Sequence, residues 1–567
     1  PALRGGLILP GDSLRLTYET VVRQNYQFTG AQVLARDELN TFVEAHYHLV
    51  DELPGVLGCN YNYKATIAVI PNQIFKDVIG GTSYVPGDMI TYRLRMILPS
   101  GDANNVIFTD YFPIPIHNVS NISLVWGGAN IVPGPNHLTS AVPIGISIIP
   151  GNNALVINFG NVMSTSSPET LEVYITVPVT TIPFANGLTH SNFLEVASDN
   201  TQLSTAANLQ LTQVYIGAPM LSLVKGVSSV FNPSAWLSAP NVFPVNSDAF
   251  NVDANDTVNF VSTITNVGGA QAFHIQAVDP MPMQLTGCQI QSVTNAIGAP
   301  VSYSGTLFGP NDTLVIDSMD ASGPFATTLI NYVCEVSTIA VPWETITNTM
   351  SIAWASAINQ DSLFARIKDS ASVRVKTPTL DKTIRSISPG HTQSLSKAHV
   401  GEAVGYAITF TIPEGATDSL LVRDVLGLGL AFAGIDSIVS SSPDLICSLG
   451  PISNIVPTVD SLTTGAVQRD RFLIFYFEEI FNKNTDNSVT EQITIYYKAR
   501  VLNATSNVRG TTLPNSVHLS WTMPTTGQIQ NIYAVSPLVT IVEPTLELDK
   551  SFLVSNVTPG DSAYVTF

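Results

Sequence analysis

A sequence pattern that recurs along the chain restricts the fold more than any other feature. Each copy opens with a Pro that precedes a Lys by four to six residues, and then runs through a polar turn into a segment with an aromatic residue near its start. In the complete copies an apolar segment that ends in Asp and a late segment that begins with Asn follow. Such self-similarity is typical of tandem domains built on one plan. The Lys-bearing segments start at Pro71, Pro219, Pro378 and Pro544.

The copies divide the chain into three complete repeats, predicted at residues 67–215, 216–376 and 377–542. Residues 1–66 contain only motifs of the closing half of a repeat, and residues 543–567 contain only its opening strands. We therefore expect 1–66 to be the C-terminal half of a preceding repeat and 543–567 the N-terminal strands of a following one. Trimming from a longer array is the plainest explanation, and a split domain completed by the next molecule is the alternative.

Strand-forming residues dominate every repeat. Segments such as 171–177 and 472–477 are rich in β-branched and aromatic residues, and clusters of Gly, Pro and Asn separate them. No stretch holds a convincing helical period, although residues 36–48 are ambiguous. Short strands with frequent turns predict an all-β chain of tandem antiparallel β-sandwiches in an elongated array.

Charge and motifs exclude several classes of function. The chain has 24 Lys and Arg against 43 Asp and Glu, and its net charge of −19 argues against nucleic-acid binding, which needs clustered basic residues. No apolar run is long enough to cross a membrane. No hydrolase elbow, zinc-protease helix, phosphate-binding loop or dinucleotide fingerprint occurs. We expect no enzyme and no cofactor, apart from calcium as an open alternative at the Asp/Asn turns 252–256 and 310–312.

One Lys, one Asp and one Asn are predicted to face the core in each complete repeat. Residues two apart on a strand share a face, and these polar residues alternate with apolar ones; Lys225, for example, shares its face with Leu221 and Leu223. Three polar groups in an apolar core need partners. The three predicted triads are Lys76, Asp110 and Asn192; Lys225, Asp279 and Asn348; and Lys382, Asp424 and Asn515. A late strand also carries a Tyr in each repeat, at Tyr174, Tyr332 and Tyr497.

Two accounts satisfy such a triad. In the first, Lys and Asp form a buried ion pair and Asn forms hydrogen bonds to both. In the second, Lys attacks the Asn carboxamide and forms an isopeptide bond with release of ammonia, an autocatalytic step. Burial favours the second account because it lowers the pKa of Lys and raises that of Asp, which supplies a neutral amine and a proton donor.

The recurring motifs resemble the conserved-repeat domain known as domain of unknown function 11, a family of bacterial and archaeal surface proteins. The resemblance lies in Pro-x-Leu-x-Leu-x-Lys at 219–225, in Gly-Asp before an aromatic strand at 87–92, and in the apolar segment that ends at Asp279. It implies immunoglobulin-like stalk repeats in an extracellular, cell-surface array, with the nine triad residues as the matching positions. The residues after the Asp depart from the family pattern, since Asp110-Tyr-Phe-Pro and Asp424-Val-Leu-Gly replace Asp-x-Leu-Pro.

Cysteines and glycosylation sequons add further candidate sites. Of the four cysteines, only Cys288 and Cys334 fall within one repeat, where a disulfide and two buried free thiols are both open. Asn-x-Ser/Thr sequons favour surface turns, where glycans would sit if the source glycosylates. The sequons are at Asn118, Asn121, Asn255, Asn311, Asn503 and Asn556.

Two functions therefore compete. The first is a structural protein whose repeats associate with one another into a filament, sheath or surface layer. The second is an adhesion module that recognises a glycan or a protein. In the second case the long insertion 230–247 is the expected contact, because it places Trp236 and Phe243 in a loop. Neither function needs nucleic acid or a membrane span in this segment.

Overall fold

The computed structural model describes residues 8–566 except 10, 48–59, 99–101, 164–167, 202–204, 306–307, 309–312, 321, 361, 390–393, 461–469, 525, 544–546, 553–555 and 563–564. The described residues form 38 strands and three short 3₁₀ helices, η1 (Val119–Asn121), η2 (Pro150–Asn152) and η3 (Ile452–Asn454). The prediction of an all-β chain is therefore confirmed. No helix in this part of the chain is long and apolar enough to span a membrane.

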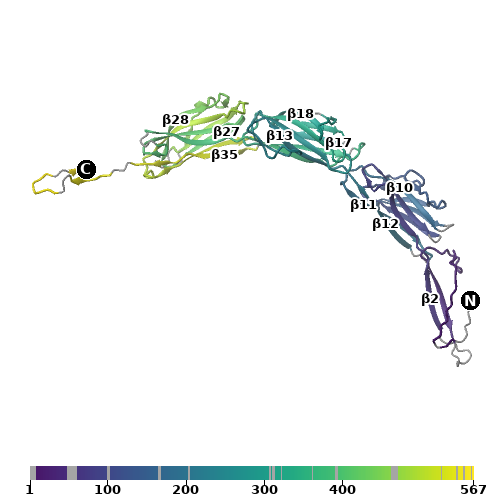
Figure 1. Ribbon diagram of the computed structural model, residues 1–567. Coiled ribbons are helices and arrows are strands. Elements are labelled where there is room, and N and C mark those ends of the chain that lie inside the picture. Colours follow the sequence, from purple (N-terminus) through teal and green to yellow (C-terminus); the bar gives the residue numbers. More distant parts are fainter. Residues whose placement is uncertain are drawn as a thin grey trace. The chain divides into compact units, whose positions relative to one another are not determined.

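Three β-sandwiches follow one another along the chain (Figure 1). Contacts group the chain into two compact units. The first unit is Pro1–Met220 with the short segments Asn266–Phe273 and Ala355–Phe364, and it holds the first sandwich. The second unit is Leu221–Thr265, His274–Trp354 and Ala365–Phe567, and it holds most of the second sandwich and all of the third.

The first sandwich has a four-stranded sheet and a six-stranded sheet. The four-stranded sheet runs in the order β3 (Gln73–Ile79), β5 (Met89–Leu98), β10 (Glu169–Pro178) and β7 (Ile131–Pro133). The facing sheet runs in the order β4 (Ser83–Tyr84), β12 (Thr205–Ile216), β11 (Leu188–Asp199), β6 (Ala103–Tyr111), β9 (Ala154–Val162) and β8 (Gly145–Ile149).

The second sandwich repeats this order. Its four-stranded sheet is β13 (Leu221–Val230), β16 (Thr257–Asn266), β21 (Thr327–Val336) and β18 (Leu285–Asn295). The facing sheet is β14 (Trp236–Leu237), β15 (Ala249–Val252), β23 (Ile367–Val375), β22 (Thr345–Ala355), β17 (Phe273–Pro280), β20 (Thr313–Met319) and β19 (Tyr303–Ser304).

The third sandwich has the same four-stranded sheet, formed by β24 (Leu380–Ser388), β26 (Ala403–Thr411), β32 (Gln492–Val501) and β28 (Leu430–Ser440). The facing sheet is β29 (Leu445–Cys447), β31 (Phe472–Asn482), β27 (Gly415–Leu426), β34 (Asn515–Met523) and β35 (Gln528–Val535), with β30 (Thr458–Asp460) paired to β31. A small third sheet joins β25 (Lys397–Ala398), β36 (Val539–Ile541) and β33 (Thr512–Leu513).

This strand order is that of an immunoglobulin-like sandwich. In that fold the first, second, fifth and fourth strands form one sheet, and the third, sixth and seventh form the other. Each sandwich here adds at least one strand between the fourth and fifth, and this strand joins the opposite sheet beside the third. Alternation of buried and exposed residues, as along β5, turns one face of each sheet into the core between the two sheets.

Two hairpins flank the sandwiches. Strands β1 (Glu38–His46) and β2 (Asn60–Ala68) form the first, and β37 (Ser551–Phe552) and β38 (Val565–Thr566) form the second. The chain before β1 is held to the first sandwich, where the Arg36 guanidinium donates to the Ser198 carbonyl at 2.7 Å and the Thr201 hydroxyl donates to Asp37 at 2.7 Å.

Cys288 on β18 and Cys334 on β21 form a disulfide between two strands of the second sandwich. Of the two alternatives open from the sequence, the structure has the bridge. Cys447 is a buried free thiol in the third sandwich, and Cys59 lies outside the described residues. The disulfide covalently links two adjacent strands of the four-stranded sheet.

Replacing both Cys288 and Cys334 with Ala should destabilise the second sandwich by about 2–4 kcal/mol, because the bridge restricts the unfolded chain. Hydrogen exchange of β21, followed by mass spectrometry, measures the free energy of local opening. Reductant should accelerate hydrogen exchange of β21 in the wild-type protein, and it should not change the exchange rate of β21 in the double variant. Equal protection of β21 in the oxidised wild type and the variant would contradict the prediction.

Candidate functional site

The nine triad residues lie on equivalent strands of the three sandwiches. In each sandwich the Lys is on the first strand of the four-stranded sheet, whereas the Asp and the Asn are on the two central strands of the facing sheet. All nine side chains are buried in the core between the two sheets. Each Lys therefore crosses from one sheet toward two polar groups on the other.

Strand register brings Asp and Asn to one face. In the first sandwich Asp110 pairs with Leu194, so Asn192 lies two residues away on the same side of β11. In the third, Asp424 pairs with Val517, and Asn515 again lies two residues away on β34. Because residues two apart share a strand face, the offset directs both side chains toward the Lys.

In the first sandwich Lys76 forms an ion pair with Asp110, and both side chains are almost completely excluded from solvent. The Lys76 Nζ atom lies 5.2 Å from the ring centroid of Tyr92 and 5.8 Å from that of Phe112. Asn192 is buried beside Asp110, but neither of its polar side-chain atoms forms a hydrogen bond of normal geometry. The first triad therefore brings the three groups together, with the Asn192 amide interacting with Asp110 and Tyr92 in a less regular geometry.

The second triad is joined through a tyrosine. Lys225 Nζ lies 2.6 Å from Asp279 Oδ2, and the Tyr332 hydroxyl donates to the same oxygen at 2.6 Å. The Asn348 amide nitrogen donates to the Tyr332 hydroxyl at 2.8 Å. The Phe260 ring centroid lies 5.8 Å from Lys225 Nζ. The polar chain thus runs from Lys through Asp and Tyr to Asn without solvent.

The third triad is the most closely assembled. Lys382 Nζ lies 2.6 Å from Asp424 Oδ1 and also donates to the side-chain carbonyl oxygen of Asn515. The Tyr497 hydroxyl donates to the other oxygen of Asp424, and Asn515 Nδ2 donates to the Tyr497 hydroxyl at 2.8 Å. Tyr406 covers the amine, with its ring centroid 5.4 Å from Nζ. The Lys382 amine therefore contacts both the carboxyl group and the carboxamide, and Tyr497 links these two groups.

Desolvation dominates the electrostatics of the triads. Burial lowers the pKa of Lys76, Lys225 and Lys382 to about 8, although the paired Asp opposes the shift. Burial also raises the pKa of Asp110 and Asp424 above the ordinary value. Both shifts favour a neutral pair, in which the amine has lost its proton and the carboxyl group holds one.

The tyrosines of the late strands are not equivalent in the three repeats. Tyr332 pairs with Phe260 and Tyr497 pairs with Tyr406, whereas Ile175 pairs with Tyr92 in the first sandwich. The sequence-based match of Tyr174 to the other two tyrosines is therefore wrong by one residue. A one-residue shift moves a side chain to the other face of the sheet, and Tyr174 is accordingly only partly buried.

The predicted surface sites have different surroundings. Of the sequon residues, Asn118, Asn121, Asn503 and Asn556 are exposed, Asn255 is partly buried, and Asn311 lies outside the described residues. In the insertion, Trp236 is 56% exposed and stacks on Phe250 with ring centroids 4.3 Å apart, and Phe243 is 60% exposed.

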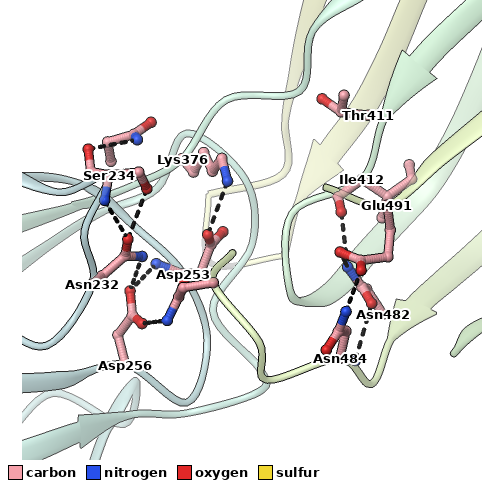
Figure 2. Close-up of polar contacts among 12 residues, drawn as sticks. Asn232, Ser234, Asp253, Asp256, Lys376, Thr411, Ile412, Asn482, Asn484 and Glu491 are labelled. Atoms are coloured by element: carbon pink, nitrogen blue, oxygen red, sulfur yellow. Dashed lines mark hydrogen bonds and ion pairs between the residues drawn. The ribbon is translucent and has the colours of Figure 1, made fainter. Parts of the chain in front are cut away.

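The turn at 252–256 belongs to an acidic cluster formed by Asp253, Asp256, Glu414 and Glu491. Sequence reasoning missed this cluster. Lys376 forms an ion pair with Asp253, with Nζ 3.2 Å from Oδ2, and Asn232 donates to Asp256 at 2.7 Å; both contacts are drawn as dashed lines in Figure 2. Asn487 of the third sandwich also donates to Asp256, at 2.8 Å. The described residues contain no group of three or more His, Cys, Asp or Glu arranged to hold a metal ion, and the turn at 310–312 lies outside them.

Glu414 lies at the centre of this cluster, and it shares a small cavity with Asp253, Glu491 and Lys376. Burial raises the pKa of Glu414 to about 8, and the charges of Asp253, Asp256 and Glu491 add to the rise, while Lys376 opposes it. Residues far apart in sequence form the cluster, so no local motif marks it.

No protein-family model matches the chain, and no curated protein sequence does. Among solved structures, the C-terminal domain of the AgI/II polypeptide BspA of Streptococcus agalactiae is 10% identical, with a TM-score of 0.24 over 56% of this chain and 100% of that chain.

Two further solved structures are similar. A fragment of the major pilin GBS80 of Streptococcus agalactiae is 11% identical, with a TM-score of 0.20 over 56% of this chain and 91% of that one. The collagen-binding subdomain of the Enterococcus faecalis surface protein ACE is 13% identical, with a TM-score of 0.17 over 29% and 95%. Because these scores are low, the fold assignment rests on the strand order.

Stability should fall as the pH rises from 4.5, the ordinary pKa of Glu, to about 8, its pKa in the folded chain. The folded state binds a proton at Glu414 that the unfolded state releases in this window, so deprotonation favours unfolding. We expect a loss of a few kcal/mol, with about 5 kcal/mol as the upper bound that solvent screening reduces, measured by urea titration at several pH values.

The variant Glu414→Gln should flatten this slope, because its side chain stays neutral. Glu335→Gln is the matched control, since Glu335 is exposed on β21 and its replacement should leave the slope unchanged. A wild-type stability that is constant over the window, or an unchanged slope in Glu414→Gln, would refute the prediction.

Proposed function

We propose that this chain is a structural repeat segment of an extracellular cell-surface protein that builds a filament, sheath or surface layer. Its sandwiches are reinforced by intramolecular isopeptide bonds between Lys76 and Asn192, Lys225 and Asn348, and Lys382 and Asn515. The observation that carries the proposal is the repeated burial of a Lys–Asp pair beside an Asn on equivalent strands of all three sandwiches. The resemblance of the repeats to surface-protein stalk domains agrees with this role.

The triad supplies the nucleophile, the acid–base group and the carboxamide of the reaction. The neutral Lys amine attacks the carboxamide carbon of Asn, and a bond forms between Nζ and that carbon. The bond from the carbon to Nδ2 then breaks, and ammonia leaves with a proton supplied by the protonated Asp. The Asp takes in its place the proton that the attacking amine loses, which is general acid–base catalysis by a buried carboxyl group. A buried pair left unreacted contributes little net stability, because desolvation offsets its attraction.

Each bond would tie the first strand of one sheet to the facing sheet. The linked residues are 116, 123 and 133 positions apart in sequence. By the chain-entropy argument developed for disulfides, closing loops of this length stabilises the fold by roughly 4–5 kcal/mol each. The disulfide of the second sandwich agrees with an oxidising, extracellular environment. Such reinforcement suits a protein that resists mechanical extension.

Adhesion is the second candidate function. The insertion of the second sandwich exposes Phe231, Trp236 and Phe243, which are 83%, 56% and 60% accessible to solvent. Exposed aromatic residues close together in sequence favour an interaction site for a glycan or a protein. Electron microscopy of the native assembly separates the functions: ordered polymers support the structural role, and monomers that bind glycans or cells support adhesion.

The purified wild-type chain should have a mass below that of its sequence by about 17 Da for each bond, since each bond releases one ammonia. Three complete bonds lower the mass three times by this amount. Intact-mass spectrometry measures the deficit, and an unshifted mass would end the crosslinking proposal. The variants Asn192→Ala, Asn348→Ala and Asn515→Ala should each remove one step of the deficit and leave the other two.

Lys64→Met is a matched control, because Lys64 is an exposed lysine of β2 outside the triads. Its mass deficit should equal that of the wild type. The third sandwich of the Asn515→Ala variant should also unfold at a lower denaturant concentration. Its free energy of unfolding should fall by roughly 4–5 kcal/mol, because the loop closure is lost. A deficit that persists in an Asn variant would assign the bond to other residues.

A further inference from the structure

We propose that Tyr332 and Tyr497 are catalytic residues that relay a proton from the Asp to the leaving nitrogen of Asn348 and Asn515. This inference rests on the proposed function, since it concerns how the isopeptide bonds form. It is independent of what the assembled repeats do at a cell surface. It distinguishes the second and third sandwiches from the first, where Ile175 stands at the position of the two tyrosines.

Each tyrosine hydroxyl lies between the two groups that must exchange the proton. In the second sandwich Tyr332 donates to Asp279 Oδ2 at 2.6 Å and accepts from Asn348 Nδ2 at 2.8 Å. In the third, Tyr497 donates to Asp424 and accepts from Asn515 Nδ2 at 2.8 Å. The nitrogen in contact with each hydroxyl is the atom that departs as ammonia. Two sandwiches with different sequences hold this same arrangement.

The relay balances the reaction. As the neutral Lys amine adds to the carboxamide carbon, the protonated Asp gives its proton to the tyrosine oxygen while the hydroxyl gives its own proton to Nδ2. The Asp, now a carboxylate 2.6 Å from Nζ in both sandwiches, then takes the surplus proton of the Lys nitrogen. The bond from carbon to Nδ2 breaks, ammonia leaves, and the tyrosine is neutral again. No external acid, base or oxidant takes part.

Burial explains why a side chain is needed for this step. Lys225, Asp279, Tyr332 and Asn348 have no solvent-exposed surface, so bulk water has no access to the leaving nitrogen. Burial also raises the pKa of Tyr332 and Tyr497 well above the ordinary value, and the nearby Asp adds to the rise. The phenol therefore carries its proton before and after the transfer, as a group that relays a proton must.

The first sandwich is a natural comparison. Ile175 occupies the position of the two tyrosines and offers no proton. The hydroxyl of Tyr92, on the adjacent strand β5, interacts with Asn192 and is hydrogen-bonded to His117 Nε2 at 3.1 Å. The bond between Lys76 and Asn192 in this sandwich involves neither Tyr332 nor Tyr497. Its rate therefore serves as an internal standard when either tyrosine is changed.

The test follows bond formation in the newly made full-length chain. Protein is produced in a cell-free translation pulse, quenched in acid at increasing times and digested. Mass spectrometry then quantifies the three crosslinked peptide pairs, each lighter by about 17 Da than the sum of its parts. The wild type is compared with Tyr332→Phe, with Tyr497→Phe, and with Tyr174→Phe as the matched control, because Tyr174 faces away from the triad of its repeat.

We expect Tyr332→Phe to slow the Lys225–Asn348 bond by about 10- to 100-fold, and Tyr497→Phe to slow the Lys382–Asn515 bond similarly, with the Lys76–Asn192 bond unchanged in both. Unchanged rates in both variants would overturn the relay while leaving the crosslinks in place. Absence of all three bonds from the wild type would instead overturn the proposed crosslinks themselves, and the relay with them.

A variant that fails to fold would slow its bond for another reason. Site-specific replacement of Tyr497 by 3,5-difluorotyrosine covers this case, because the side chain keeps its shape and hydroxyl but becomes more acidic. If the hydroxyl relays the proton, the pH dependence of the Lys382–Asn515 rate shifts to lower pH. A pH profile identical to that of the wild type, in a protein of equal thermal stability, would rule the relay out.

Discussion

Desolvation of a single lysine in each sandwich is the constraint on which the rest of the site depends. An ammonium group in an apolar core is costly unless it is paired, and pairing repays the cost only with good geometry. The fold supplies that geometry from the opposite sheet, because Asp and Asn occupy neighbouring strands with a fixed offset of two residues. The aromatic rings that exclude water also hold the amine close to its partners. The same burial that endangers stability therefore prepares the chemistry.

The three sandwiches share the positions of the triad residues but differ in the residues around them. The Lys, Asp and Asn keep their strands in all three, while the neighbouring polar groups differ. Tyr332 and Tyr497 bridge Asp to Asn in the second and third sandwiches, and Ile175 breaks this bridge in the first. The second sandwich alone carries the disulfide between β18 and β21. The core triad is thus common to the repeats, and its surroundings are specific to each.

Much of this arrangement is predictable from strand parity. Lys225 shares a face with Leu221 and Leu223, and alternation of this kind places a residue on the core side without knowledge of the partners. The role of Tyr332 is not predictable in the same way, because a hydrogen bond depends on rotamers and on register between strands. Tyr174 illustrates the limit, since a match that looks equivalent in sequence is displaced by one residue in the sheet.

The acidic cluster lay beyond prediction for a different reason. Glu414 follows a strand of the third sandwich, whereas Asp253 and Asp256 belong to a turn of the second. Each carboxylate is an ordinary turn or loop residue when its own segment is considered alone. Only the packing of distant segments makes them neighbours and removes water from between them. A single sequence contains no signal for such a meeting.

The position of the triads on the strands has a consequence for length under tension. Lys lies on the first strand of each sandwich and Asn on the next to last strand of the facing sheet, so nearly the whole domain lies between them. An unfolded chain extends by about 3.3–3.6 Å per residue. With the three proposed bonds in place, about 1,200–1,300 Å of chain could not be drawn out by pulling on the ends. The covalent path through the protein would then run through a few strands at each end of a domain, and the remaining residues would carry no tension.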